Sequence, residues 1–487
     1  MNKTIISAIF NHADKHPDKL ALIAKDQLIS YQRLKEKIFF CYAAMKSSGV
    51  KPSDKVILAA TQSPSFVFGY FAAHLLGAVA VPIDPNISKN NLEYIVEQTN
   101  PAKIFLSKCV ISGAIPIDEL DAADLNLHDV NTGDAIATDD VADVLFTTGT
   151  TSRPKGVVLT HRNIYSAAHH INSFIGNSSQ DREIVPLPLS HSFGLGRLRC
   201  NMLAGGTLII CDSIVQLKKI FSDMNAWKAT GFCSVPAGFA LMLKLSGDKL
   251  GEYSAQLKYI EIGSAPMPME TKKKLMELLP KTRICMHYGL TEASRSCFIE
   301  FNSENDKLAS VGRPSPNVDV RICDGNHNVL PNGCEGNIHV EGPHVMKEYL
   351  NNPELTERAF YGDWLDTGDV GVVDDDGYVY LKGRQNEIIN VGGLKVRPDE
   401  VEEFLKDIDI VKDCACVGIP DPRGISGECV KAFLVLKENN SLDQSKAAIA
   451  KYLRSKIEEY KIPSVFEVID KIPRTSSGKI QRQMLKK

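Results

Sequence analysis

The chain has 487 residues, of which 44% are hydrophobic and 24% charged, so it is too long for one compact core and two or more domains are expected. Its formal net charge of −3 excludes a general electrostatic attraction to nucleic acid or to an anionic membrane. The 12 cysteines are scattered without a C-x-x-C pair. They predict free thiols in a reducing cytoplasm rather than a zinc site or a disulfide framework.

Two apolar segments fall short of what a membrane requires. The first 16 residues hold too short an apolar run for a signal peptide. The run at residues 66–81 contains His74 and two glycines and stops at Pro82, whereas a bilayer span needs about 20 apolar residues. This pattern predicts a buried helix followed by a strand, no membrane span and a cytoplasmic location.

Up to about residue 380, apolar strand-like segments alternate with segments of helical periodicity, such as residues 92–98 and 269–279. Continuous apolar strands between helices predict mostly parallel sheets with helices on both faces. From Gly312 onward, short strands are separated by Gly, Pro, Asn and Asp turns. This change predicts antiparallel hairpins, which would form a small β-barrel-like subdomain.

A new pattern begins after Arg384. Helix-like segments at residues 398–408 and 445–460 alternate with strand-like segments at residues 413–419 and 428–436. We therefore predict an α/β fold with a large amino-terminal domain (residues 1–384) and a small α+β carboxyl-terminal domain (residues 385–487).

The most unusual segment is TTGTTSRPKG, residues 147–156, which follows an apolar strand. Backbone N–H groups of glycine-rich turns and nearby hydroxyls bind anions, and a lysine supplies the countercharge. The segment therefore predicts a phosphate-binding loop. Pro154 stands where a Walker A loop needs glycine, which disfavours a P-loop kinase. The expected contacts are Thr147, Thr148, Gly149, Thr150, Thr151, Ser152, Lys155 and Gly156.

The loop resembles the signature loop of the adenylate-forming superfamily, which contains acyl-CoA synthetases, aryl-CoA ligases, peptide-synthetase adenylation domains and luciferases. Further segments match motifs of that family in the same order, and the resemblance spans essentially the whole chain. They are AVAVPIDP (78–85), PLPLSHSFGLG (186–196), HYGLTEAS (287–294), WLDTGDVG (364–371), YLKGRQNEIINVGGLKVRPDEVE (380–402) and PRTSSGKIQR (473–482).

The resemblance implies an enzyme that joins a small-molecule carboxylic acid to the α-phosphate of ATP, releases pyrophosphate and passes the acyl group to a thiol. It implies ATP, Mg²⁺ and coenzyme A as cofactors. One alternative is a free-standing adenylation enzyme that loads the phosphopantetheine of an acyl carrier protein. Another is a nucleotide-binding module without turnover, although such a module need not keep Lys479.

The resemblance also assigns roles to individual residues. Thr147, Thr150 and Lys155 are expected at the β- and γ-phosphates. The family pattern places Lys479 at the reacting carboxylate and α-phosphate during adenylation. The other expected contacts are Gly263, Ser264 and Ala265 at the adenine and acyl pockets, Tyr288 and Gly289 at adenine, Thr291 at the α-phosphate, Glu292 at Mg²⁺, and Asp369 with Arg384 at the ribose.

In this family the carboxyl-terminal domain is mobile and turns between two poses. The matching hinge residue is Asn386, where most relatives carry Asp or Lys. Asn tolerates unusual backbone angles, so a hinge is still expected there. Gly393 matches the glycine beside the path of the thiol, where the missing Cβ leaves room for a ligand.

The acid-binding side is expected around the PLPLSHSFGLG segment. His191 matches the gating residue of acyl- and aryl-CoA ligases, and Ser192 stands where amino-acid-activating domains place Asp, which disfavours an α-amino acid. Phe193, Arg197 and His287 are expected to line the pocket. We hypothesise that Arg197 reads a second acidic or hydrogen-bonding group of the substrate. The alternative is a structural ion pair with an acid elsewhere in the chain.

Overall fold

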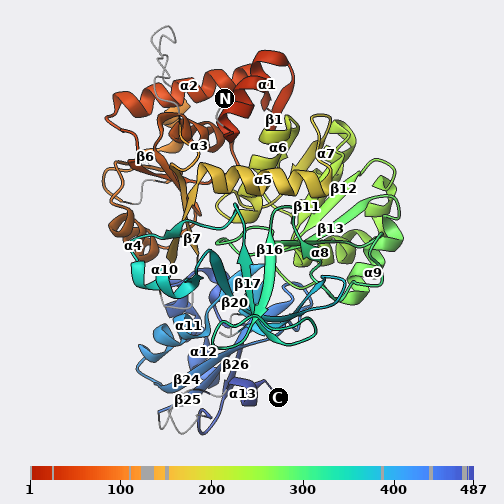
Figure 1. The fold of residues 1–487 in the computed structure, drawn as a ribbon. Coiled ribbons are helices and arrows are strands. Elements are labelled where there is room, and N and C mark those ends of the chain that lie inside the picture. The colour runs from red at the N-terminus through yellow and green to blue at the C-terminus, as the bar shows by residue number, and fades with distance from the viewer. Residues whose placement is uncertain are drawn as a thin grey trace.

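The computed structural model describes residues 3–24, 27–108, 111–121, 136–147, 153–384, 389–437, 442–473, 480 and 482–486. In Figure 1 a large amino-terminal part lies above a small carboxyl-terminal domain. No helix of these ranges is both long and apolar enough to cross a bilayer. The cysteines of the same ranges are free thiols, all buried except Cys334.

The largest sheet is parallel at its centre and antiparallel at its two edges. Its central strands are buried on both faces, as continuous apolar strands predict. Its nine strands, in spatial order, are β15 (Arg313–Pro314), β14 (Cys297–Glu300), β13 (Arg283–Tyr288), β12 (Tyr259–Ile262), β11 (Gly231–Ser234), β9 (Arg182–Val185), β10 (Thr207–Ile210), β1 (Leu20–Ala24) and β2 (Gln27–Ser30).

A second sheet has seven strands and a parallel centre, with β8 and β18 antiparallel at one edge. In spatial order they are β18 (Glu348–Tyr349), β8 (Lys155–Thr160), β7 (Val141–Thr147), β4 (Val79–Ile83), β3 (Lys55–Ala59), β5 (Lys103–Leu106) and β6 (Ile115–Pro116).

Helices fill the space between these sheets and cover their outer faces. The core between the sheets is formed with α1 (Ile5–Lys15), α2 (Tyr31–Ser47), α3 (Pro64–Leu76), α5 (His161–Ile175) and α6 (Ser192–Ala204). A second core joins the nine-stranded sheet to α7 (Leu217–Trp227), α8 (Pro236–Ser246) and α9 (Met269–Leu278). The outer face of the seven-stranded sheet packs on α4 (Lys89–Thr99). The result is five alternating layers.

The apolar run at residues 66–81 folds as predicted, into helix α3 followed by strand β4. Pro64 begins the helix, where its missing N–H has no partner to lose. Gly77 ends the helix with φ 72°, a left-handed conformation that glycine adopts without strain. Nearly all residues of α3 are buried, which explains an apolar run without a polar face.

The predicted hairpins after Gly312 form an antiparallel five-stranded sheet. This confirms the antiparallel subdomain predicted for this part of the chain. The short helix α10 (Pro353–Ala359) precedes its edge strand β19. The strands are β16 (Asp319–Cys323), β17 (Gly336–Glu341), β20 (Trp364–Val373), β19 (Phe360–Tyr361) and β21 (Val379–Arg384).

The carboxyl-terminal residues build a separate α+β core, which includes Val401, Leu405, Val430 and Leu453. The division at residues 384 and 385 stays a prediction, because residues 385–388 are outside the described ranges. The elements are β22 (Ile389–Val391), β23 (Leu394–Val396), α11 (Pro398–Lys406), β24 (Val411–Pro420), β25 (Glu428–Leu436), α12 (Leu442–Arg454), β26 (Val465–Val468) and α13 (Arg482–Leu485).

Helix α5 buries two histidines, His161 and His170, at 1% and 2% exposure. The His161 ring contacts His74 edge to face, and the His170 ring contacts His344 in the same way, both at 5.0 Å between centroids. Burial lowers the pKa of His161 to about 3 and that of His170 to about 4. Both rings are therefore neutral near pH 7.

The burial of these two rings predicts that the folded chain loses stability in acid. An unfolded chain takes up protons on histidine near pH 6.5, whereas the folded chain does so only below pH 4, so stability is lost as the pH falls. Between pH 7 and pH 5, each ring should lower the free energy of unfolding by about 2 kcal/mol. His170→Gln should therefore show a smaller fall in the urea midpoint over this range than the native chain.

The matched control is His169, which is exposed on the same helix. His169→Gln should keep the native pH dependence, because it leaves both buried rings in place. Equal falls for His170→Gln and the native chain would contradict the assignment.

Candidate active site

The two strands that flank the predicted phosphate-binding loop pair as an antiparallel hairpin. Thr147 at the end of β7 lies opposite Lys155 at the start of β8. A Cβ on Gly156 would lie 3.0 Å from atoms of both Val144 and Leu350, so glycine lets the hairpin pack closely. The hairpin thus holds Lys155 and Thr147 side by side, one and two strands in from the β18 edge of the seven-stranded sheet. Thr148, Gly149, Thr150, Thr151 and Ser152 lie outside the described residues.

Tyr349 connects this hairpin to the expected magnesium ligand, and sequence reasoning missed it. The Lys155 ammonium lies 5.2 Å from the centre of the Tyr349 ring, within cation–π range. The Tyr349 hydroxyl donates a 2.8 Å hydrogen bond to Oε1 of Glu292. One side chain of β18 therefore positions both a loop cation and the carboxylate. Nothing in the local KEYL sequence reveals this, because Glu292 lies 57 residues away.

The expected adenine and ribose residues are hydrogen-bonded to each other. The Tyr288 hydroxyl donates to Oδ2 of Asp369 at 2.7 Å, and both side chains are buried. Burial, and after it the charge of Asp369, raises the pKa of Tyr288 well above its usual value, so the phenol keeps its proton. Asp369 lies opposite Arg384 in the register of β20 and β21, and only the backbone of Arg384 is described.

Two further close contacts involve residues that follow Tyr288 in the sequence. A Cβ on Gly289 would lie 2.4 Å from the backbone nitrogen of Arg295, so only glycine fits there. The Thr291 hydroxyl lies 3.4 Å from that of Ser192, which brings the α-phosphate candidate to the start of α6.

A turn of the carboxyl-terminal domain packs against the predicted adenine loop, residues 263–265. Nδ2 of Asn390 donates to the carbonyl of Ser264 at 2.8 Å, and Oδ1 of Asn390 accepts from the Gly393 N–H at 3.0 Å. A Cβ on Gly393 would lie 2.9 Å from Val235 and 3.5 Å from the Cβ of Ser264. The absence of a side chain at Gly393 therefore permits this close approach. Sequence reasoning found Gly393 but missed Asn390, three residues earlier.

The acid-side residues lie at the start of α6 and the end of β13. Protein atoms crowd the His191 ring, which stays solvent-accessible, and this crowding lowers its pKa although Asp84 opposes the shift. The Phe193 and His287 rings meet edge to face with centroids 4.7 Å apart. His287 also fills the space above Gly263, where a Cβ would lie 2.0 Å from the imidazole. These residues therefore form one packed group.

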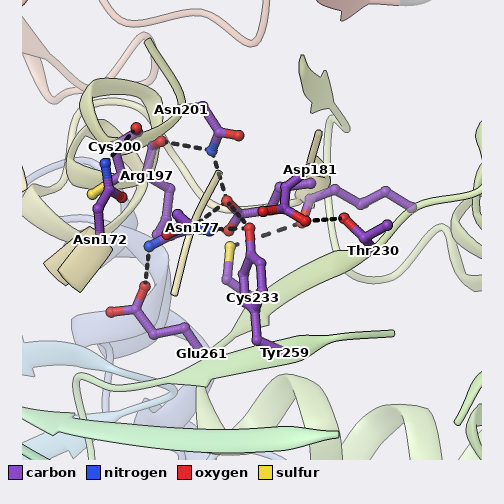
Figure 2. A network of polar contacts seen from close by, with 12 residues as sticks. Asn172, Asn177, Asp181, Arg197, Cys200, Asn201, Thr230, Cys233, Tyr259 and Glu261 are labelled. Carbon is purple, nitrogen blue, oxygen red and sulfur yellow. Dashed lines mark hydrogen bonds and ion pairs between the residues drawn. The ribbon is translucent and has the colours of Figure 1, made fainter. Parts of the chain in front are cut away.

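Arg197 points instead into a buried network of ion pairs, which Figure 2 shows. Its Nε and Nη2 donate to the two carboxylate oxygens of Glu183 at 2.7 and 2.5 Å. Its Nη1 lies 3.0 Å from Oε2 of Glu261, and all three side chains are fully buried. Asn201 and Tyr259 donate further hydrogen bonds to Glu183, at 2.6 and 3.0 Å.

This geometry contradicts the hypothesis that Arg197 reads a second group of the substrate. Burial disfavours the charge, but the two glutamates outweigh it and raise the pKa of Arg197 well above its usual value. Because two carboxylates already hold the guanidinium, the structural alternative is correct. The sequence placed Arg197 on the right helix, but the helix turns it toward the sheet.

The same ion-pair network also holds the residues expected at the acid-binding pocket. Oε1 of Glu261 lies 2.7 Å from Nδ1 of His287 and accepts from Nε of Arg295 at 3.2 Å. Arg295 also donates to the carbonyls of Ser192 and Phe193 at 2.8 and 3.0 Å. Burial, opposed by Glu261, lowers the pKa of His287 and keeps it neutral. Arg295 thus fixes the start of α6, another role that the sequence did not reveal.

The family comparison agrees with this arrangement. The family model described as AMP-binding enzyme matches residues 9–350. The family model described as AMP-binding enzyme C-terminal domain matches residues 400–479. The chain belongs to the AMP-binding enzyme family. The resemblance predicted from the motifs is therefore confirmed, and with it the enzyme class, an AMP-forming acyl-CoA synthetase.

Similar proteins cover nearly the whole chain of this AMP-binding enzyme. A feruloyl-CoA synthase of an Amycolatopsis species is 29% identical over 463 residues, which are 93% of this chain and 92% of that protein. A 2-succinylbenzoate–CoA ligase of Bacillus velezensis is 29% identical over 488 residues, with 98% and 96% covered.

Two solved structures of one similar enzyme differ in how well they superpose on this chain. The o-succinylbenzoate CoA synthetase of Bacillus subtilis, a double mutant bound with its product analogue OSB-NCoA, matches with TM-score 0.89 at 25% identity and covers 98% of this chain and 97% of its own. The same enzyme in complex with AMP matches with TM-score 0.73 at 26% identity, covering 99% and 98%.

The ion-pair network generates a stability prediction. Arg197→Met leaves Glu183 and Glu261 buried without this partner, and breaking a buried pair costs about 3–5 kcal/mol. We expect a loss of that size in urea unfolding. The control is Arg33→Met, which removes an exposed 3.0 Å pair with Glu36 and should cost less than about 1 kcal/mol.

The same variant separates the two interpretations of Arg197. Turnover of a monoacid and of a diacid should fall by the same factor, because the guanidinium does not touch substrate. A selective loss on the diacid, or a stability cost no larger than that of Arg33→Met, would contradict the structural role.

Proposed function

We propose that this enzyme activates an aromatic or aryl-substituted carboxylic acid with ATP and Mg²⁺ and transfers the acyl group to coenzyme A. The observation that supports this most strongly is the convergence of side chains from several family motifs. The Tyr288–Asp369 pair, the Glu292–Tyr349–Lys155 group and the Gly393 turn all lie around the same family motifs. The substrate class is inferred from feruloyl- and succinylbenzoate-activating relatives.

The chemistry requires charge to be spread over the α-phosphate while two anions are brought together. Preorganised cations and dipoles achieve this, each contributing about 3–4 kcal/mol of transition-state stabilisation. Lys155 is assigned to the outer phosphates and Thr291 to the α-phosphate. The Tyr288 ring would stack on adenine while Asp369 accepts from the ribose hydroxyls, with Arg384 donating nearby.

Glu292 fits an Mg²⁺ ion, since this hard cation prefers carboxylate oxygen. The Tyr349 hydroxyl already orients that carboxylate through its 2.8 Å hydrogen bond. Mg²⁺ bound there would neutralise phosphate charge. The remaining cation is assigned to Lys479, which lies outside the described residues, as does the hinge candidate Asn386.

The arrangement of the carboxyl-terminal domain favours a thiol-transfer pose. Asn390 and Gly393 hold their turn against the Ser264 loop, where the family pattern expects the thiol to pass. The higher TM-score to the product-analogue complex, 0.89 against 0.73 for the AMP complex, supports the same interpretation. Coenzyme A is favoured over a carrier-protein phosphopantetheine because the named relatives are CoA ligases. A cytoplasmic location accords with free thiols and these cofactors.

The direct test is an acid panel with ATP and Mg²⁺, scored for pyrophosphate and for thioester with and without coenzyme A. Ferulate, 2-succinylbenzoate, benzoate and palmitate would sample ring and chain acids. We expect an aromatic acid to give both products. Pyrophosphate without a CoA thioester would favour the carrier-loading alternative, and no pyrophosphate with any acid would favour a binding module.

On the best acid, Lys479→Ala should slow pyrophosphate release by about 10²–10³-fold, the usual cost of one missing charge-stabilising donor. Lys471→Ala, which removes an exposed lysine of the same segment, is the control. Adenylation at the native rate in Lys479→Ala would refute the assigned role.

Asn390→Ala should act on the other half-reaction. Its amide makes two hydrogen bonds that hold the turn against Ser264, each with a net value of about 1 kcal/mol. Thioester formation from preformed acyl-adenylate should fall about tenfold or more, while pyrophosphate release stays within twofold of native.

Asn91, which joins the two domains through Glu458 at 2.8 Å, is the matched control. A comparable loss of thioester formation in Asn91→Ala would show that any interdomain contact suffices and would remove the special role of Asn390.

A further inference from the structure

Three side chains of the types that bind metal ions meet on the antiparallel five-stranded sheet. They are His339 of β17, Asp366 of β20 and His327 of the turn between β16 and β17. One ligand atom of each lies within 4.8 Å of the other two. In the register of the sheet, His339 lies directly opposite Asp366. Chain segments far apart in sequence therefore bring two imidazoles and a carboxylate to one point.

His339 gives a second, independent indication of a ligand. Its side chain is 0% exposed, and neither ring nitrogen has a hydrogen-bond partner among the described residues. Its Nε2 lies 3.9 Å from Oδ2 of Asp366, too far for a hydrogen bond. A buried polar group without a partner is costly and requires an explanation.

His327 completes the group from the turn. Its Nδ1 is also buried and has no hydrogen-bond partner in the described part of the chain, and its ring centre lies 5.4 Å from that of His339. Asp324 holds the turn by accepting from the N–H groups of Asn326 and Asn328 at 2.8 and 2.9 Å. His327 has φ 64°, a conformation that Asn also tolerates.

We propose that His327, His339 and Asp366 bind one divalent transition-metal ion, with Zn²⁺ as the physiological candidate. Imidazole nitrogens and a carboxylate are typical zinc ligands, whereas Mg²⁺ and Ca²⁺ prefer oxygen. Zinc bonds of about 2.0–2.2 Å join ligand atoms up to about 4 Å apart, so a bound ion would draw the three ligand atoms, now within 4.8 Å of one another, slightly closer together. Three protein ligands leave a fourth position for water.

This site is separate from the Mg²⁺ assigned to Glu292. Along β20 the burial alternates, so Thr367 and Asp369 lie on the buried face and Asp366 on the other. Bound metal would tie the β16–β17 turn to β20 on the face opposite Asp369. The charge of Arg321, the cross-strand neighbour of His339, opposes a cation there, and Asp366 offsets it.

The test uses the untagged full-length enzyme, stripped with a chelator and dialysed against buffered Zn²⁺, with bound metal counted by mass spectrometry. We expect one equivalent per chain that excess Mg²⁺ does not displace. His327→Asn, which keeps the turn geometry, should weaken binding at least tenfold, as should His339→Gln. Co²⁺ in place of Zn²⁺ should give visible absorption bands that both variants lose.

His169→Asn, which removes an exposed histidine elsewhere, is the control and should bind as the native chain does. If His339→Gln does not fold, His327→Asn alone decides. The proposal is overturned if the native chain binds no Zn²⁺, if His327→Asn binds it as tightly as the native chain, or if His169→Asn loses it. The cluster would then be a packed group in which the His327 and His339 rings each stack on Tyr361.

Discussion

The residues expected on the acid-binding side depend on a buried, charge-balanced set of two carboxylates and two guanidiniums. Glu183 on β9 and Glu261 on β12 hold Arg197 of α6, and Glu261 also holds Arg295. Because an ion in this dry layer loses several kcal/mol of solvation, each member requires its partners in place. The set therefore fixes where α6 begins relative to the nine-stranded sheet, and with it the positions of the acid-side residues.

The position of the site follows from how the parallel strands end. The phosphate loop follows β7, the His191 segment follows β9, the Ser264 loop follows β12 and the Tyr288 motif ends β13. Parallel strands of one sheet present their carboxyl ends at the same edge, where ligands of open α/β folds bind. Two such sheets, the antiparallel sheet that carries Asp369, and the Gly393 turn bring groups from four structural units to one place.

The contacts of the carboxyl-terminal domain suit a domain that must also move. Asn390 contributes one side-chain hydrogen bond to a backbone carbonyl of the larger part, and Gly393 contributes only the absence of a side chain. Such contacts are specific in geometry but small in energy, so a domain held by them can leave without a large penalty. A large apolar interface would hold one pose and oppose the other.

The sequence by itself determined the parallel sheets, the hairpins and the family motifs, because hydrophobic periodicity, turn residues and contiguous motifs are local properties of the chain. It did not determine which way Arg197 points, since its partner Glu183 lies 14 residues away and its neighbour Tyr259 lies 62. The Tyr349–Glu292 and Asn390–Ser264 bonds, across 57 and 126 residues, and the meeting of His339 with Asp366, likewise exist only once the layers have packed. Packing decides these pairs because a side chain finds a distant partner only when two elements fix its direction.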